Sequence, residues 1–139
     1  MGDEHQRALE LEQQVLQLTR GNGIGVPLDA EFRQLPIGKA EILRRGRHGL
    51  VWAIGSTVYP ALEAIERLAK EGIEITLVNA RFVKPLDREL LALQIDQFGG
   101  LEGGARLATV EEHSLAGGFG SAVMEALSEM ELSRVTTLA

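Results

Sequence analysis

The sequence predicts an α/β fold in which strands and helices alternate around a mostly parallel sheet. Apolar, strand-like runs alternate with amphipathic segments of helical length, and glycine- or proline-containing turns separate them. Such alternation is typical of βαβ units, whose crossovers are right-handed. A chain of 139 residues is long enough for one domain with its own core.

The first 35 residues are predicted to lie apart from this domain. Ala8, Leu11, Val15 and Leu18 share one face of a helix, and the glycine-rich run at residues 20–27 indicates a loop. We therefore expect a helix at residues 1–18, which is either a remnant of a preceding domain or unrelated sequence. A linker at residues 19–35 and an α/β domain at residues 36–139 follow.

The strands of that domain are recognised by short apolar runs. Strands are expected at residues 39–43, 50–54, 73–78 and 106–110, and residues 134–138 have the composition of a last strand that the chain leaves incomplete. The run at residues 50–54 is apolar throughout, as expected for a parallel strand that is buried on both faces. A turn rich in arginine, at residues 44–48, separates the first two strands and is expected to be solvated.

Three helices are predicted between these strands. The first spans residues 58–70; Ser56 or Thr57 is expected to cap it, and Gly72 to end it in a left-handed conformation. The second runs from an N-cap at Asp87 to about residue 98, with apolar contacts from residues 90, 91, 93, 95 and 98. The third spans residues 119–130 and places Val123, Leu127 and Met130 on one face.

Composition excludes several classes of function. The net charge of −6 makes a nucleic-acid partner unexpected, because phosphate binding needs clustered lysine and arginine. The absence of cysteine excludes disulfides and thiolate chemistry. No apolar run is long enough to span a bilayer and no signal peptide is evident, so we expect no membrane partner and a cytoplasmic location.

Residues 79–87 follow a predicted strand at the point where open α/β sheets place their chemistry. Arg81 and Lys84 carry positive charge there, Pro85 restricts the backbone, and Asp87 begins the next helix. Arg81 is a candidate clamp for a carboxylate or phosphate, or an ion-pair partner that fixes the loop.

Residues 109–120 lie at the end of the next predicted strand, residues 106–110. Glu111, Glu112 and His113 are candidates for proton transfer, although a structural or interface role is the simpler interpretation. Gly117, Gly118 and Gly120 open a helix whose amides could bind an anion, or they mark a turn that tolerates no Cβ. No nucleophile elbow, P-loop or metal-ligand cluster accompanies them, so the residues alone indicate no self-sufficient active site.

Three segments, residues 36–43, 79–87 and 109–120, resemble the C-terminal, transketolase-like domain of 1-deoxy-D-xylulose-5-phosphate synthases. Residues 20–27 resemble the linker into that domain. The resemblance implies an enzyme that condenses pyruvate with glyceraldehyde 3-phosphate, using thiamine diphosphate and Mg²⁺, and feeds isoprenoid, thiamine and pyridoxal phosphate synthesis. It also implies a three-layer α/β/α fold, in which a mixed, mostly parallel sheet of five strands lies between helices. In addition, it implies that this domain supports a dimer, and that Arg20 is the residue to test as a ligand of the substrate phosphate.

The same resemblance implies that the cofactor, metal and catalytic residues belong to two earlier domains, so we expect this chain to bind no cofactor by itself. The linker motif is only partly present, and the family's final helices have no counterpart. Three hypotheses follow: a truncated and inactive domain; an interaction module or split-transketolase subunit that docks on separate catalytic subunits; and a regulatory domain that binds anions through Gly117–Gly120. An incomplete last strand further predicts self-association through its edge.

Overall fold

The computed structural model describes residues 34–100, 104–114, 116–130 and 136–138, all in the compact unit Arg33–Ala139. The helix expected at residues 1–18, most of the linker and Arg20 lie outside the described residues. The strands are β1 (Glu41–Arg44), β2 (Gly49–Ala53), β3 (Ile75–Asn79), β4 (Arg106–Val110) and β5 (Thr136–Leu138). The helices are the 3₁₀ turn η1 (Gly55–Thr57), α2 (Val58–Lys70), α3 (Arg88–Gln97) and α4 (Phe119–Glu129).

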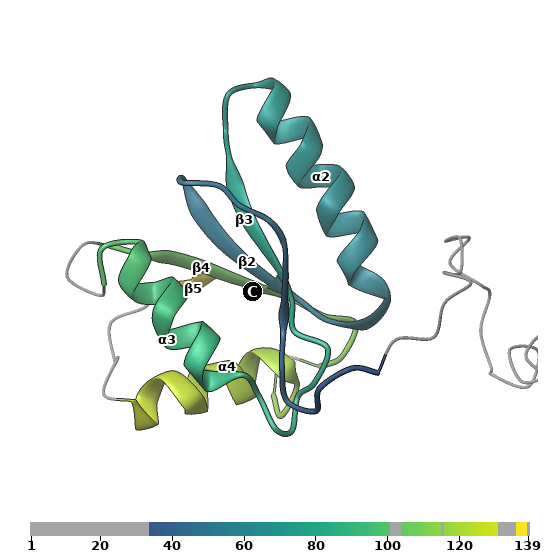
Figure 1. Cartoon of the computed structure of the whole chain (residues 1–139), viewed down its shortest axis with the longest axis vertical. Helices are drawn as coiled ribbons and strands as arrows, with labels where there is room; N and C mark the ends of the chain where they lie inside the picture. Colours follow the sequence, from purple (N-terminus) through teal and green to yellow (C-terminus); the bar gives the residue numbers. More distant parts are fainter. Residues whose placement is uncertain (1–33, 101–103, 115, 131–135, 139) are drawn as a thin grey trace, which may run out of the picture. The chain divides into compact units, whose positions relative to one another are not determined.

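The strands form one mixed sheet in the order β1-β3-β2-β4-β5. The pairs β3–β2, β2–β4 and β4–β5 are parallel, and β1 is an antiparallel strand at the edge beside β3. The connection through α2 leads from β2 to β3, whereas α3 carries the chain from β3 back across β2 to β4. Because right-handed crossovers in opposite directions lie on opposite faces, this order places α2 on one face and α3 with α4 on the other (Figure 1).

Alternate residues of β2 supply the two halves of the core. Leu50 and Trp52 pack with α3 and α4, whereas Val51 and Ala53 pack on the α2 side. Trp52 is fully buried, together with Leu91 and Ile95 of α3 and Val123 of α4. The predicted three-layer, mostly parallel α/β fold is therefore confirmed.

The structure corrects several local expectations. Thr57 stands at the N-cap of α2 but makes no side-chain cap bond; its hydroxyl donates instead to the carbonyl oxygens of Ile54, at 2.7 Å, and Val110, at 3.0 Å. Leu93 is 54% exposed rather than a core contact, because it lies on the outer side of α3. The expected left-handed end of α2 is present, since Gly72 has φ +84°.

Candidate functional site

The segments singled out from the sequence meet at the carboxyl edge of the sheet. The chain leaves β2 toward the α2 face and leaves β4 toward the α4 face, so the strand order reverses between these neighbours. Ligands of open α/β proteins bind in the crevice at such a point. A cavity of about 420 Å³ lies there, and its lining residues are Ile54, Gly55, Ser56, Val83, Glu112, His113, Ser114, Gly117, Gly118 and Phe119.

Arg81 is held by its own neighbours within the loop after β3. Its backbone has φ +58°, an unusual value for a residue with a side chain, and its amide donates to the Asn79 side chain at 3.1 Å. Its guanidinium forms an ion pair with Glu41 of the edge strand β1. The side chain is 20% exposed, so this cation is engaged in fixing the loop rather than free to clamp a ligand.

Lys84 and Pro85 follow on the exposed part of the same loop, and the peptide bond between them is cis. Pro85 lies against the chain that enters the domain, because a Cβ added at Gly38 would come within 2.7 Å of its Cγ. The close approach explains why a glycine stands at position 38, where φ is +73°.

Asp87 joins the beginning of β1 to the beginning of α3. One carboxylate oxygen accepts from the Leu90 amide at 3.1 Å and caps α3, and the other accepts from the Ala40 amide at 3.0 Å. The residue is 6% exposed, so these bonds replace the water that its charge would otherwise bind. Lys39 lies beside it; a hydrogen bond to Glu89, and then the charge of Asp87, raise the pKa of Lys39 above its usual 10.5.

Glu111 fills the anion-binding position that the glycine loop offers. Its carboxylate accepts from the Phe119 amide at 2.5 Å and from the Gly120 amide at 2.8 Å, at the N-terminus of α4. Added Cβ atoms at Gly118 and Gly120 would meet this carboxylate at 2.6 and 3.3 Å, so the loop needs glycines to close around it. The loop therefore binds a carboxylate of its own chain, and an external phosphate or diphosphate does not fit there unless Glu111 leaves.

Glu112, His113 and Ser114 are exposed and line the crevice. Strand β4 ends at Val110, so these residues lie in the loop that follows it. The Ser56 hydroxyl lines the same cavity and is buried without a hydrogen-bond partner among the described residues. No described group of three or more His, Asp or Glu side chains could hold a metal ion. The crevice is thus lined by exposed polar side chains, and the role of Glu112 and His113 stays a prediction.

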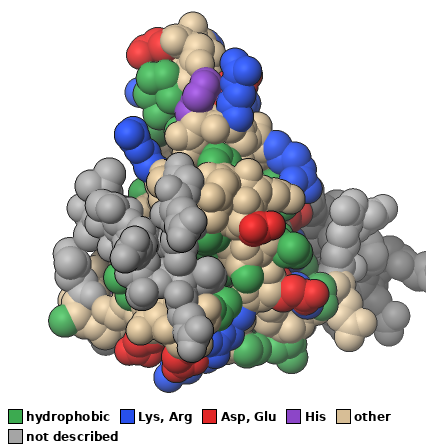
Figure 2. Space-filling view, turned by 90° about the vertical axis from the view of Figure 1, so that its left-hand side faces the viewer, with side chains coloured by type: hydrophobic (Ala, Val, Ile, Leu, Met, Phe, Trp, Pro, Cys, Tyr) green, Lys and Arg blue, Asp and Glu red, His purple; other side chains and the backbone are tan. Residues whose placement is uncertain are grey.

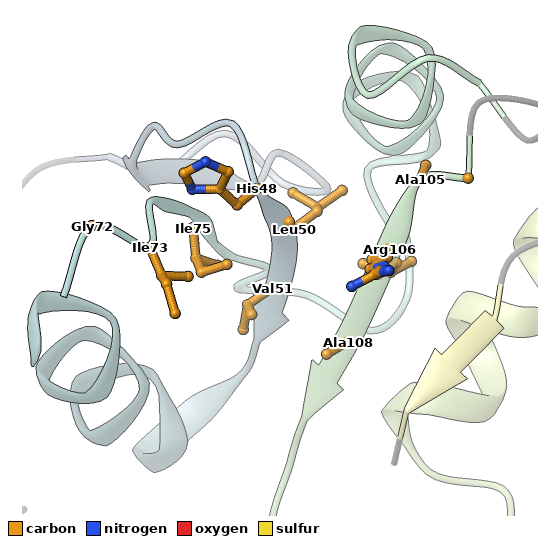
Figure 3. Close-up of a pocket in the computed structure, with 12 residues that line it drawn as sticks. His48, Leu50, Val51, Gly72, Ile73, Ile75, Ala105, Arg106 and Ala108 are labelled. Carbon is orange, nitrogen blue, oxygen red and sulfur yellow. The ribbon is translucent and has the colours of Figure 1, made fainter. Parts of the chain in front are cut away.

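A larger hollow, of about 760 Å³, lies at the opposite, amino edge of the sheet on the α2 face (Figure 3). It is lined by the first residues of β2, β3 and β4 rather than by the loops that carry the motifs. We take the carboxyl edge as the candidate site, because that edge holds the switch in strand order and the contacts of Arg81, Asp87 and Glu111.

Sequence reasoning identified Arg81, Asp87 and Glu111 but not the residues they bind. Glu41 begins β1 and Ala40 directly precedes it. This segment is distant in sequence and becomes a neighbour only through the antiparallel pairing of β1 with β3. One local pattern could have indicated the hydrogen bonds between Glu111 and α4: the sequence places a glutamate shortly before a glycine-rich helix start. In the described part of the chain, no helix is both long and apolar enough to cross a bilayer.

Comparisons with known proteins agree with this architecture. Residues 38–137 match the family model described as transketolase, C-terminal domain. Over 119 residues the chain is 56% identical to 1-deoxy-D-xylulose-5-phosphate synthase 1 of Geobacter metallireducens, a match that covers 86% of this chain and 18% of that protein. The synthase of Halothermothrix orenii is 47% identical over 113 residues, covering 81% of this chain and 17% of that protein.

Among solved structures, one described as a split gene transketolase, inactive beta4 tetramer, superposes with a TM-score of 0.66. It is 37% identical in sequence, and the match covers 81% of this chain and 36% of that chain. This chain therefore spans less than a fifth of the length of the curated relatives and about a third of the solved one.

Proposed function

This chain belongs to the transketolase C-terminal domain family, and on that basis we propose that it serves as the C-terminal domain of a cytoplasmic 1-deoxy-D-xylulose-5-phosphate synthase. The enzyme would join pyruvate to glyceraldehyde 3-phosphate with loss of carbon dioxide. Within it, this domain would support the assembly of the catalytic domains and would not turn over substrate alone. Identity of 47–56% to synthases is the observation that carries the proposal.

The contacts at the carboxyl edge support an assembly role. The conspicuous charged side chains there, Arg81, Asp87 and Glu111, are all engaged by their own chain. Large apolar side chains are nevertheless exposed in the segments around that edge; they are Leu35, Ile37, Tyr59 and Val83, with 48, 78, 46 and 37% of their surface accessible. Exposed apolar groups beside rigid loops favour contact with another protein surface.

Thiamine diphosphate and Mg²⁺ would be held by the other domains of such an enzyme. The helix N-terminus that could receive a diphosphate is occupied by the Glu111 carboxylate. The contribution of this chain would be to position neighbouring domains, and through them the cofactor.

A domain exchange tests the proposal. The segment of the Geobacter metallireducens synthase that matches this chain is replaced by this chain, and formation of 1-deoxy-D-xylulose 5-phosphate is measured with thiamine diphosphate and Mg²⁺ present. We expect turnover by the chimera and none by this chain alone or by the relative without its C-terminal segment. Turnover by the isolated chain, or a folded chimera that binds cofactor but is inactive, would contradict the proposal.

The split-gene neighbour favours a second candidate, in which this chain is a separate subunit that docks on catalytic subunits. The two candidates differ in the polypeptide that carries the catalytic domains. Affinity purification from the source cells, followed by mass spectrometry, should recover either one long chain containing this sequence or a distinct chain with the remaining domains.

A further inference from the structure

A further cavity, of about 480 Å³, lies at the amino edge of the sheet, on the face that α3 covers. It shares no lining residue with the hollow on the α2 face or with the crevice at the carboxyl edge. Its walls come from the turn between β1 and β2, from the start of β3 and from the C-terminal end of α3. The volume is in the range of small-molecule sites, and none of the described residues that line it is a carboxylate.

Gln94 lines this cavity with half of its amide unpaired. The residue is 2% exposed, and its Nε2 donates to Oε1 of Gln97 at 2.9 Å. Its own Oε1 is buried and has no hydrogen-bond partner among the described residues. A carbonyl oxygen buried in this way costs free energy, because it has lost water without gaining a donor. The unpaired oxygen therefore indicates a ligand that supplies an N–H or O–H group.

The turn between β1 and β2 adds positive charge to the same cavity. Arg45 is exposed and forms no ion pair with a described residue. The Nε of Arg44, the residue before it, is buried and also lacks a described partner. Arg47 is already engaged, since its Nε lies 3.2 Å from Oε2 of Glu74. Guanidinium groups bind phosphate oxygens through paired N–H groups, so an unpaired arginine beside a polar cavity favours an anionic ligand.

Backbone contacts fix the turn that presents these arginines. The Thr76 hydroxyl accepts from the Gly46 amide at 2.8 Å and donates to the Gly46 carbonyl oxygen at 2.9 Å. The amides of Arg47 and His48 both donate to the Glu74 carbonyl oxygen, at 3.0 and 2.8 Å. A Cβ added at Gly46 would lie 2.5 Å from the backbone where β3 begins, so the turn packs directly on that strand. An arginine on a fixed turn loses less conformational freedom on binding than one on a loose loop.

An aromatic ring forms another wall of the cavity. Phe98 follows the end of α3 and is half-buried; it packs on the core and also lines the cavity. Aromatic rings bind flat heterocycles by stacking, and a nearby amide can bind the polar edge of such a ring. Figure 2 shows the molecule from the side at which β2 and β4 begin in Figure 1, and Lys and Arg side chains project from several places on that surface. An anionic end, a flat ring and a hydrogen-bonding edge are together the chemistry of a mononucleotide.

We propose that the cavity bounded by Arg45, Gln94 and Phe98 is a binding site for a mononucleotide. The phosphate pairs with Arg45, the base stacks on Phe98, and an N–H group of the base donates to Oε1 of Gln94. The unpaired Gln94 oxygen and the unpaired Arg45 guanidinium are the observations that carry the assignment. The site lies at the opposite edge of the sheet from the candidate site described above, and the proposal does not depend on the reaction proposed for the enzyme.

Isothermal titration calorimetry of the full chain tests the proposal. The probes are the 5′-monophosphates of adenosine, guanosine, cytidine and uridine, together with ribose 5-phosphate, which lacks the base, and adenosine, which lacks the phosphate. We expect at least one mononucleotide to bind, with one site per chain, at concentrations up to about 5 mM. It should bind about tenfold more tightly than ribose 5-phosphate, because stacking and the hydrogen bond to Gln94 need the base.

Three variants separate the contacts, and circular dichroism checks that each one folds. Arg45→Gln should weaken binding of the mononucleotide about tenfold and leave binding of adenosine unchanged. Gln94→Met keeps the length of the side chain but removes the unpaired oxygen, so it should weaken binding of the mononucleotide about fivefold and leave ribose 5-phosphate unchanged. Arg106→Gln is the matched control, because it removes the same charge from an exposed arginine at the same edge but on the α2 face.

The proposal is overturned if none of the four mononucleotides binds. It is also overturned if the folded Arg45→Gln chain binds them as tightly as the Arg106→Gln chain, because the attraction would then come from the general charge of the surface. Binding of ribose 5-phosphate as tight as that of every mononucleotide would likewise overturn it, since the base would then have no site.

Discussion

Replacement of Glu111 tests whether the glycine loop is held by an internal anion. Its carboxylate makes two charge-assisted hydrogen bonds to the first amides of α4, at 2.5 and 2.8 Å. Each such bond contributes about 1.5 kcal/mol or more to stability, and a negative charge at a helix N-terminus adds up to about 1 kcal/mol. Because water can reach this partly buried position and replace some of that energy, we expect Glu111→Ala to cost about 2–3 kcal/mol.

The glutamine variant separates hydrogen bonding from charge. Glu111→Gln keeps one acceptor oxygen but turns an amide NH₂ group toward the second backbone N–H, so we expect an intermediate loss of about 1–2 kcal/mol. Urea unfolding followed by circular dichroism, at one fixed protein concentration, measures both losses. For a domain of about 100 residues the alanine variant should melt roughly 8–15 °C below the unchanged chain.

The control is the neighbouring carboxylate Glu112, which is exposed and should change stability by no more than about 0.5 kcal/mol when replaced by alanine. If Glu111→Ala and Glu112→Ala unfold at the same urea concentration, the loop is not held by an internal carboxylate and our reasoning about it is wrong.

Three further predictions concern other contacts. Asp87→Ala should lower the free energy of unfolding in urea by about 2–3 kcal/mol, because it removes the two oxygens that accept from the Ala40 and Leu90 amides at a residue that is 6% exposed. Asp87→Asn should cost less, because asparagine can still cap the helix. Equal losses for the two variants would contradict this reasoning. Lys39 has a raised pKa, so the stability that it contributes should be present below pH 10.5 and lost as the pH rises through its folded-state pKa. The difference in urea midpoint between Lys39→Met and the unchanged chain should accordingly be constant from about pH 8 to 10 and vanish above the folded-state pKa of Lys39. A difference that grows with pH would contradict a stabilising contact between Lys39 and its carboxylate neighbours. Gly46→Ala should lower the free energy of unfolding by about 3 kcal/mol, because its Cβ would lie 2.5 Å from the backbone of Glu74 and Ile75. Gly72→Ala should cost about 1 kcal/mol, because Gly72 has φ +84° but open space around it. A lower melting temperature for the Gly72 variant than for the Gly46 variant would contradict this reasoning.

The alternation of apolar, strand-like runs with amphipathic, helix-like segments was sufficient to predict the layers of the fold and the positions of most helices and strands. Residues 58–70 and 106–110 were placed as the structure has them, because apolar periodicity and bounding glycines act locally. The N-cap at Asp87 was also predictable, since a capping residue and its helix are adjacent in the chain.

The pairing of loops could not be predicted from local signals. Thr57 looked like a helix cap, but its hydroxyl bonds the carbonyl of Val110 at the end of another strand, a partner that only the sheet order brings near. The ion pair of Arg81 with Glu41 depends in the same way on β1 running antiparallel beside β3. Chemistry at the carboxyl edge is decided by contacts between distant segments, which a single sequence does not contain.

The position of the Glu111 carboxylate at the N-terminus of α4 has a consequence for how this domain folds. Here the chain carries the counter-ion as one of its own side chains. The first turn of α4 can therefore form without a bound phosphate or other external anion.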